Sequence, residues 1–330
     1  MIAVLAGLPL AFVLALGNPD PQGLLIVANK QAASASLIDV ASGRTLATLP
    51  TGTGPHEVAA SRDGRWAVVT DYGAQTPGSS LTVLDLRRRA VARTIDLVAF
   101  RRPHGVAFLP GDSLVAVTSE ANQAVLVVNI VRGEVVRDIP TEQRGTHMVS
   151  VTADGRKGYT ANIPDGTISE IDFASGTATR RLPIAPMTEG VAVSPDGRWV
   201  WVGSNAAHTV TVVDTRSWQA VDTLPGSTTP YRVNISPDGR IAVVSYPTEN
   251  VVRLYDGATR AELGTVSIPG PRGGDAGPLG SSISADSRYA YVALVAQDAV
   301  AVVDLREKTV VKYLETGRGP DGIAITANRE

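Results

Sequence analysis

One short motif recurs seven times along this chain at a nearly constant spacing, and this recurrence constrains the fold more than any other feature of the sequence. The motif is Ser or Thr, any residue, Asp, Gly and Arg, with four full copies and three degenerate ones. Its third positions fall at residues 63, 111, 154, 196, 238, 286 and 328, so successive copies are 42 to 48 residues apart. A repeat of this length, made of short apolar runs, is typical of a four-stranded β-propeller blade.

Each repeat contains four strand-like runs separated by turn sequences, as residues 190–193, 198–202, 209–214 and 219–224 illustrate. Their apolar and β-branched content suits strands that are covered on both faces. Seven repeats therefore predict an all-β fold, a seven-bladed β-propeller that forms a single domain over residues 24–330. The first repeat lacks its first strand, and residues 322–326 supply one. The N- and C-terminal strands are thus expected to share one blade and to close the ring, which removes an exposed sheet edge.

The third strand-like run of every repeat ends in Asp or Asn. Seven aligned polar residues resemble a chemical site, but each lies where a side-chain oxygen caps a tight turn. We therefore expect a structural role for this set, which comprises Asp39, Asp85, Asn129, Asp172, Asp214, Asp256 and Asp304.

The repeats resemble a known family. Residues 159–162 (Tyr-Thr-Ala-Asn), residues 201–205 (Trp-Val-Gly-Ser-Asn) and the Asp-Gly-Arg turns are similar to the YVTN repeat of bacterial seven-bladed propellers, the YncE-like proteins. The resemblance covers residues 24 to 330. It implies a propeller that binds a ligand or a partner, and it is specific for the fold rather than for a function.

The N-terminal residues 1–17 are apolar and uncharged up to a Gly-Asn-Pro break, and the first basic residue is Lys30. An apolar segment of this length is too short to span a bilayer comfortably, and Ala15-Leu16-Gly17 offers a signal-peptidase pattern. We interpret residues 1–17 as a signal peptide of a periplasmic or secreted protein. An uncleaved segment that anchors the protein to a membrane is the alternative. The chain has no cysteine, so disulfide bonds contribute nothing.

The charge of the chain limits its partners. The net charge is −2 and the isoelectric point is about 6.1, which gives no electrostatic footprint for nucleic acid. A small-molecule ligand or a protein at the top face, defined as the end of the channel where each innermost strand begins, fits better. No stable membrane span is expected after cleavage of the signal.

Histidine carries the sharpest functional signal. Three of the four histidines, His56, His104 and His147, occupy one equivalent position just before the innermost strand of consecutive repeats, and Glu189 follows in the next. His208 is expected on the same face. Side chains in this column converge at the mouth of the central channel. Loops on a rigid scaffold are where binding and chemistry usually reside.

Three imidazoles and a carboxylate are suitable ligands for one divalent transition metal ion, such as Zn²⁺ or Fe²⁺. The candidate ligands are His56, His104, His147 and Glu189, with His208 as a weaker one. The principal hypothesis is a ligand-binding site lined by these residues, with or without metal. The alternative is a metal-dependent hydrolase or lyase that acts on a lactone or ester, with Glu189 as general base and Arg102 or Arg232 holding an anionic group. A purely structural role for the histidines is the third possibility.

Overall fold

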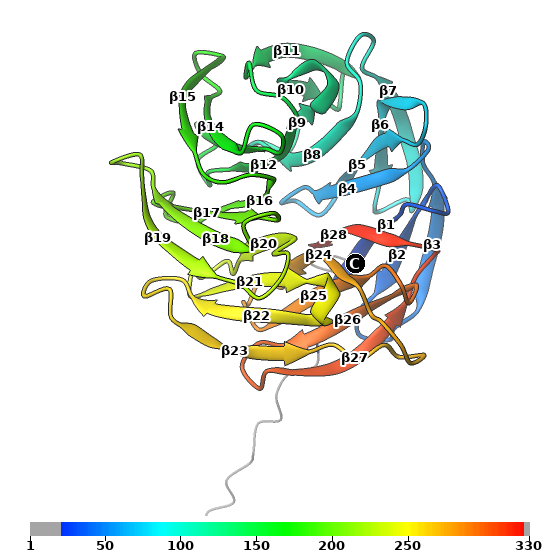
Figure 1. Cartoon of the computed structure of the whole chain (residues 1–330). Helices are drawn as coiled ribbons and strands as arrows, with labels where there is room; N and C mark the ends of the chain where they lie inside the picture. The colour runs from blue at the N-terminus through cyan, green and yellow to red at the C-terminus, as the bar shows by residue number, and fades with distance from the viewer. Residues whose placement is uncertain (1–20, 327–330) are drawn as a thin grey trace, which may run out of the picture.

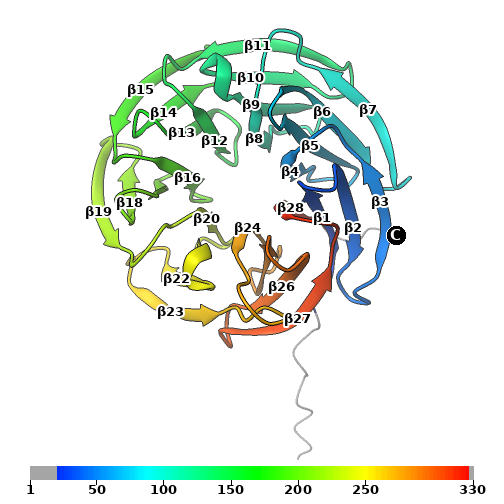
Figure 2. The same ribbon diagram turned by 45° about the vertical axis from the view of Figure 1, so that its right-hand side comes forward.

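The computed structural model describes residues 21–326, and it shows 28 strands in seven four-stranded antiparallel sheets around a central axis (Figure 1). The predicted seven-bladed all-β propeller is therefore confirmed. We number the blades so that blade 1 contains both chain ends. Seen along the axis, the first strand of each blade lies innermost and the fourth forms the rim (Figure 2).

Blades 1 to 4 are formed by the first 15 strands together with β28. They comprise β28 (Pro320–Thr326), β1 (Leu24–Asn29), β2 (Ser34–Asp39) and β3 (Thr45–Pro50); β4 (Pro55–Ala60), β5 (Trp66–Gly73), β6 (Pro77–Asp85) and β7 (Ala90–Asp96); β8 (Pro103–Phe108), β9 (Leu114–Ser119), β10 (Ala124–Asn129) and β11 (Glu134–Pro140); β12 (Thr146–Val151), β13 (Lys157–Asn162), β14 (Thr167–Asp172) and β15 (Thr177–Pro183).

Blades 5 to 7 complete the ring. They comprise β16 (Thr188–Val193), β17 (Trp199–Ser204), β18 (Thr209–Asp214) and β19 (Gln219–Pro225); β20 (Arg232–Ile235), β21 (Ile241–Tyr246), β22 (Val251–Asp256) and β23 (Glu262–Ser267); β24 (Pro278–Ile283), β25 (Tyr289–Leu294), β26 (Ala299–Asp304) and β27 (Thr309–Glu315). Two single-turn 3₁₀ helices, η1 (Glu120–Asn122) and η2 (Pro247–Glu249), lie in loops between second and third strands.

The hydrophobic core consists of seven clusters, one at each interface between neighbouring blades. Between blades 5 and 6, for example, Trp201 packs in the same cluster as Tyr246 and Tyr255. No blade buries its apolar faces alone, so the stability of each blade depends on its neighbours. This arrangement explains why the middle strands read as nearly continuous apolar runs.

The predicted closure of the ring is also confirmed. β28 pairs antiparallel with β1, with Leu24 opposite Thr326 and Ile26 opposite Ala324. The two ends of the described chain thus lie side by side in blade 1 (Figure 1). The predicted signal peptide, residues 1–17, lies outside the described residues. Within residues 21–326, no helix is both long and apolar enough to cross a membrane.

The repeated motif forms the turn between the first and second strands. In blade 2, the Ser61 hydroxyl donates to Asp63 at 2.6 Å and accepts a hydrogen bond from the Trp66 amide at 2.9 Å. The same pattern recurs at Ser194 and Ser236. The Asp and Asn residues that end the third strands accept hydrogen bonds from backbone amides in the next turn, as predicted.

Candidate metal centre

The three histidines predicted to converge do so at the top of the central channel. His56, His104 and His147 are the second residues of β4, β8 and β12, and they are 5%, 0% and 7% exposed. Their rings form a stack, with centroids 4.0 Å apart between His56 and His104 and 3.6 Å apart between His104 and His147. Three imidazoles from three blades therefore share one buried volume.

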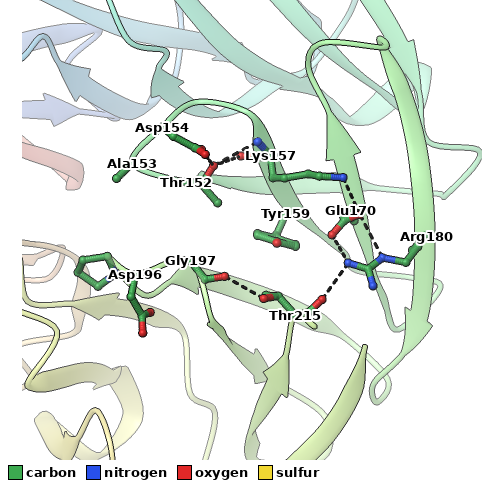
Figure 3. Close-up of a pocket in the computed structure, with 11 residues that line it drawn as sticks. Thr152, Ala153, Asp154, Lys157, Tyr159, Glu170, Arg180, Asp196, Gly197 and Thr215 are labelled. Atoms are coloured by element: carbon green, nitrogen blue, oxygen red, sulfur yellow. Dashed lines mark hydrogen bonds and ion pairs between the residues drawn. The ribbon is translucent and has the colours of Figure 1, made fainter. Parts of the chain in front are cut away.

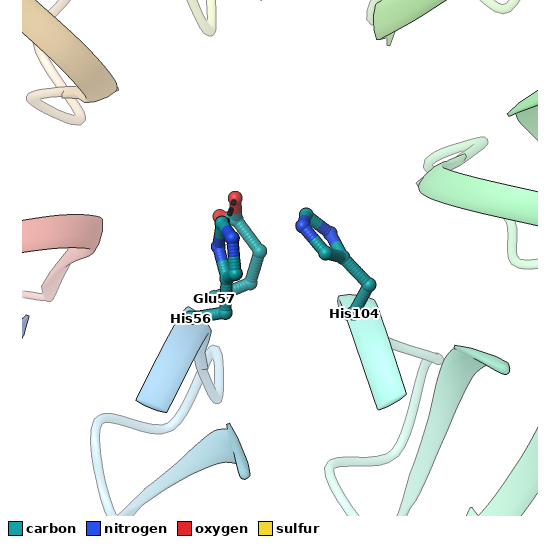
Figure 4. A group of neighbouring side chains, drawn as sticks. All are labelled: His56, Glu57 and His104. Carbon is teal, nitrogen blue, oxygen red and sulfur yellow. Dashed lines mark ion pairs between the residues drawn. The ribbon is translucent and has the colours of Figure 1, made fainter. Parts of the chain in front are cut away.

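A β-bulge lies at this column of residues in six of the seven innermost strands. In blade 2, Pro55 pairs with Asp71 and Val58 pairs with Val69, so one extra residue is accommodated around His56 and Glu57. Bulges re-aim side chains that would otherwise alternate between faces. His56 and Glu57 consequently rise together from β4 and point to the space that His104 approaches from β8 (Figure 4).

Hydroxyl groups of the second strands hold the bulged segments in place. The Thr118 hydroxyl accepts a hydrogen bond from the Gly105 amide at 2.8 Å and donates to the carbonyl oxygen of His147. The Thr70 hydroxyl accepts equivalently from the Glu57 amide at 3.0 Å. These side chains replace ladder hydrogen bonds that the bulges remove, and they tie the backbone of one histidine blade to the next.

Close packing of the innermost strands also depends on glycine. Four of the seven strands have glycine immediately after the column residue, namely Gly105, Gly190, Gly280 and Gly322. A Cβ at Gly322 would lie 2.2 Å from the carbonyl oxygen of His56, a distance that no side chain tolerates. Glu57 and Arg232 are the two charged residues at this position, and their side chains occupy the channel directly below the histidines.

The central imidazole has no hydrogen-bond partner within the described residues. Neither ring nitrogen of His104 has a hydrogen-bond partner in residues 21–326. Because the ring is completely inaccessible to solvent, bulk water cannot supply one either. A buried polar group without a partner costs about 1–3 kcal/mol. His56 Nδ1 and His147 Nε2 also lack a hydrogen-bond partner among the described residues, and they lie 3.3 Å from Asp321 and 3.4 Å from Glu189.

Two groups of potential metal ligands share this central imidazole. One contains His56, Glu57 and His104, and the other contains His104, Glu120 and His147, with the ligand atoms of each group within 4.8 Å of one another. Figure 4 shows the first group. Glu120 begins η1, in the loop after β9, and its carboxylate accepts hydrogen bonds from His147 Nδ1 and, at 2.7 Å, from the Tyr72 hydroxyl.

A buried arginine connects the acidic residues below the histidines. Arg232, only 3% exposed, donates to Glu57 at 2.7 Å and to Glu189 at 2.8 Å, and Asn205 donates to the second oxygen of Glu189. Burial alone would raise the pKa of Glu189, but His147 and Arg232 outweigh it and lower this pKa to about 2. Burial alone would lower the pKa of Arg232, but Glu57 and Glu189 hold it well above its ordinary value.

The protonation of the histidines follows from their neighbours. Burial, together with nearby positive groups, lowers the pKa of His56 and of His104 well below the ordinary value, so both rings are neutral at pH 7. Burial acts in the same direction on His147, but hydrogen bonds to Glu120 and Glu189 outweigh it and raise its pKa. The neutral rings of His56 and His104 therefore lie beside a third imidazole, His147, that is paired with two carboxylates.

The structure places the remaining predicted residues as follows. Glu189 contacts His147, yet it belongs to neither group of ligands. Arg102 lies over the Tyr72 ring, 4.7 Å from its centroid, and Tyr72 in turn contacts the edges of His56 and His104. His208 is exposed in the turn between β17 and β18 and, within residues 21–326, belongs to neither group, because its turn stands clear of the buried column.

Glu57 and Glu120 were not predicted from the sequence. Glu57 occupies the position where most repeats have glycine. This departure from the repeat could have identified Glu57 as a candidate site residue. Glu120 gave no comparable signal, because it lies in a loop whose conformation does not follow from the repeat.

A second pocket, of about 420 Å³, lies at the opposite end of the blades, between blades 4 and 5 (Figure 3). Lys157 Nζ lies 3.1 Å from the Glu170 carboxylate, and Arg180 pairs with the same carboxylate and donates to the Thr215 carbonyl oxygen at 2.9 Å. The charged side chains thus satisfy one another. We interpret this pocket as lined by a structural ion-pair cluster of blade 4, which Arg180 links to blade 5.

The fold and the site together define a class: seven-bladed propellers with a histidine and carboxylate cluster at the mouth of the channel. A family model, that of the cytochrome D1 heme domain, matches residues 110–328. The chain therefore belongs to the cytochrome D1 heme domain family. The likeness to the YVTN repeat remains a resemblance. No curated protein matches the sequence.

Among solved structures, the chain is similar to hydrazine synthase of Kuenenia stuttgartiensis, with a TM-score of 0.71 and 19% sequence identity over 82% of this chain and 88% of that chain. It is also similar to a functionally unknown protein from Desulfotomaculum acetoxidans DSM 771, with a TM-score of 0.78 and 14% identity over 93% of this chain and 100% of that chain. At these identities the similarity shows the fold alone.

The family name implies a haem, but the channel does not fit one. Adjacent imidazoles are separated by 3.6 and 4.0 Å between centroids, so no macrocycle can lie between them. The cavity that Glu57 and Arg232 line measures about 150 Å³, whereas cofactor pockets measure about 300–1,000 Å³. Arg232 is already paired with two carboxylates of the protein and is not free to bind those of a haem. The donor atoms instead form the two small groups described above, whose size suits a metal ion.

Proposed function

We propose that this protein binds a divalent transition metal ion at the top of the channel, with His104 as the central ligand and His56 and His147 as its neighbours. The observation that carries the proposal is the His104 ring, which is completely buried with both nitrogens unpartnered among the described residues. A metal ion bound to one nitrogen would offset part of this cost. Neutral imidazole is the commonest metal ligand in proteins.

The ligand chemistry favours Zn²⁺ or Fe²⁺ over Mg²⁺ or Ca²⁺. Imidazole suits the transition metals, whereas the harder cations prefer sites made only of oxygen. At Zn–N distances of about 2.0–2.1 Å, tetrahedral ligand atoms lie about 3.3 Å apart. The atoms of each group are within 4.8 Å of one another, so the side chains need to tighten by at most about 1.5 Å around an ion. Glu57 and Glu120 supply the negative charge.

Binding is supported better than catalysis. The hydrolase or lyase alternative needs a free general base, and the most effective bases have a pKa near the working pH. The pKa of Glu189 is lowered to about 2, after hydrogen bonds from His147 and charge from Arg232 outweigh burial, and its oxygens accept from Arg232 and Asn205.

The wider proposal is an exported metal-binding propeller that presents its loaded top face to a small ligand or a protein. Two long segments support this choice of face, because the β5–β6 hairpin and residues 269–277 before β24 both lengthen it. Export rests on the sequence of residues 1–17 alone.

A titration with Co²⁺ tests the proposal, because tetrahedral Co²⁺ gives intense visible absorption when it replaces Zn²⁺. The wild-type protein, stripped of metal, should bind one equivalent and develop this absorption. His104→Ala should lose it, whereas His208→Ala, which changes the exposed histidine, should behave as wild type. Equal spectra for His104→Ala and wild type would refute the proposed site.

A further inference from the structure

The ammonium group of Lys30 occupies one ring nitrogen of His56, which is a candidate metal ligand. Lys30 Nζ donates a hydrogen bond to His56 Nε2 at 2.7 Å and a second to Asp321 at 3.1 Å. We infer that Lys30 is a tethered cation that fills this side of the metal site when no ion is bound, and that metal binding displaces it. The inference rests on the proposed metal site.

The hydrogen bond fixes which lone pair is in use. An ammonium group only donates, so His56 Nε2 must accept, and the ring proton of His56 is then on Nδ1. His56 Nδ1 faces Asp321 at 3.3 Å, which suits this tautomer. With the ring proton on Nδ1, the only lone pair that the His56 ring can offer to a metal ion is the one on Nε2, and Lys30 occupies it. Lys30 and a metal ion on His56 Nε2 are therefore mutually exclusive.

The side chain of Lys30 can move away from His56 into solvent, whereas the side chains of its two partners are buried. It lies in the turn between β1 and β2, and its side chain is 37% exposed, while the side chains of His56 and Asp321 are 6% and 1% exposed. Of these three side chains, only that of Lys30 is substantially exposed. When it departs, Asp321 remains beside His56 Nδ1 and becomes the carboxylate that orients a ligating histidine, an arrangement usual around metal sites.

The second cation of the channel behaves differently. Arg232 is buried and is bound to Glu57 and Glu189. Its guanidinium stays with these carboxylates whether or not metal is present. The channel thus has one permanent cation and one exchangeable cation, and the exchangeable one compensates Asp321 while the metal site is empty.

Removal of Lys30 should therefore tighten metal binding. A hydrogen bond to a charged group that must be broken on binding corresponds to about a tenfold or larger change in affinity. Competition with a chromogenic chelator, using Zn²⁺ and Co²⁺ as the probes, should give dissociation constants for Lys30→Met and Lys30→Gln at least about tenfold below wild type. Lys312→Met, which removes an ammonium that contacts only backbone oxygens of blade 1, is the matched control and should not change them.

Nitrogen NMR of the metal-free protein gives a readout that does not depend on metal. In wild type, the signals of His56 should show a protonated Nδ1 and an Nε2 that accepts a hydrogen bond, and the Nε2 shift should move in Lys30→Met. If Lys30→Met binds metal no more tightly than wild type while His104→Ala loses it, the displacement is wrong and the metal site stands. If neither wild type nor Lys30→Met binds metal, the proposed function fails, and the inference fails with it.

Discussion

Arg232 on β20 reaches Glu57 on β4, 175 residues away in the chain, and donates hydrogen bonds to it at 2.7 and 3.2 Å. The same guanidinium also binds Glu189 on β16. One buried cation therefore joins blades 2, 5 and 6 beneath the histidine cluster. Ion pairs instead of apolar side chains occupy the channel at this level, and their mutual attraction must offset the cost of burying the charges.

Arg232→Met should be strongly destabilising, because it leaves Glu57 and Glu189 buried and uncompensated. Removal of one partner from a buried ion pair costs about 3–5 kcal/mol. Urea denaturation should therefore show a lower free energy of unfolding by this amount. Arg132→Met breaks the exposed pair between Arg132 and Glu134 and should cost at most about 1 kcal/mol. Equal costs for the two variants would show that Arg232 does not compensate the buried carboxylates.

Thr118→Val should loosen the site while the shape of the side chain is preserved. The change removes the acceptor for the Gly105 amide and the donor to the His147 carbonyl oxygen, and each unsatisfied buried group costs about 1–3 kcal/mol. We expect lower stability and weaker metal binding, because both bulged histidine segments shift. Thr94→Val on the exposed face of β7 is the control. If the Thr118→Val protein were less stable but bound metal with wild-type affinity, the metal site would not depend on the hydrogen bonds that hold the bulged segments.

Asp71 should make stability depend on pH. Burial raises its pKa to about 6, although Ser80, Thr82 and the Gly52 amide all donate to it. The unfolded value is about 3.9, so the folded state holds the proton more tightly. The contribution of Asp71 to stability is thus fully present below about pH 4 and is lost as the pH rises through 6.

Comparison with Asp71→Asn isolates this effect from other titrating groups. Relative to the variant, the free energy of unfolding of wild type should fall by about 3 kcal/mol at most between pH 4 and pH 7. The exposed residue Asp138 supplies a control, Asp138→Asn. A difference between wild type and Asp71→Asn that stays constant with pH, or rises, would contradict the assignment.

Closure of the ring by β28 should control the stability of the whole protein. Ile323, 6% exposed, packs in the cluster between blades 7 and 1, and Ile323→Ala should cost about 2–5 kcal/mol. Val311→Ala, at a residue 49% exposed on β27, should change stability by no more than about 0.5 kcal/mol. A chain that ends at Gly319 lacks β28 and should lose cooperative unfolding. Unchanged unfolding of that truncated chain would refute the closure.

The fold could be predicted from the sequence because each blade repeats the same local chemistry. The turn at Ser61 and Asp63 and the capping residue Asp85 have equivalents in other blades. The length of one repeat was therefore enough to predict the seven sheets and their order in the chain. The convergence of His56, His104 and His147 followed from the same alignment. These predictions needed only the spacing of the repeats and the geometry of a closed ring.

The rest of the site could not be derived from the period. A regular strand alternates its side chains, so the bulge that places both His56 and Glu57 in the channel is invisible in the alignment. Glu120 and Lys30 enter from loops, where the repeat does not determine conformation. His208 was expected on the same face and as a weaker ligand, but it is exposed and, among the described residues, belongs to neither group of ligands.

Anomalous X-ray diffraction from crystals of the metal-loaded protein, collected on both sides of the absorption edge of the metal, tests the central claim most directly. We predict one strong anomalous peak at the top of the channel, about 2.0–2.1 Å from a ring nitrogen of His104, with Lys30 turned away from His56. A loaded crystal with no peak in the channel, or with its only peak elsewhere on the propeller, would contradict the account.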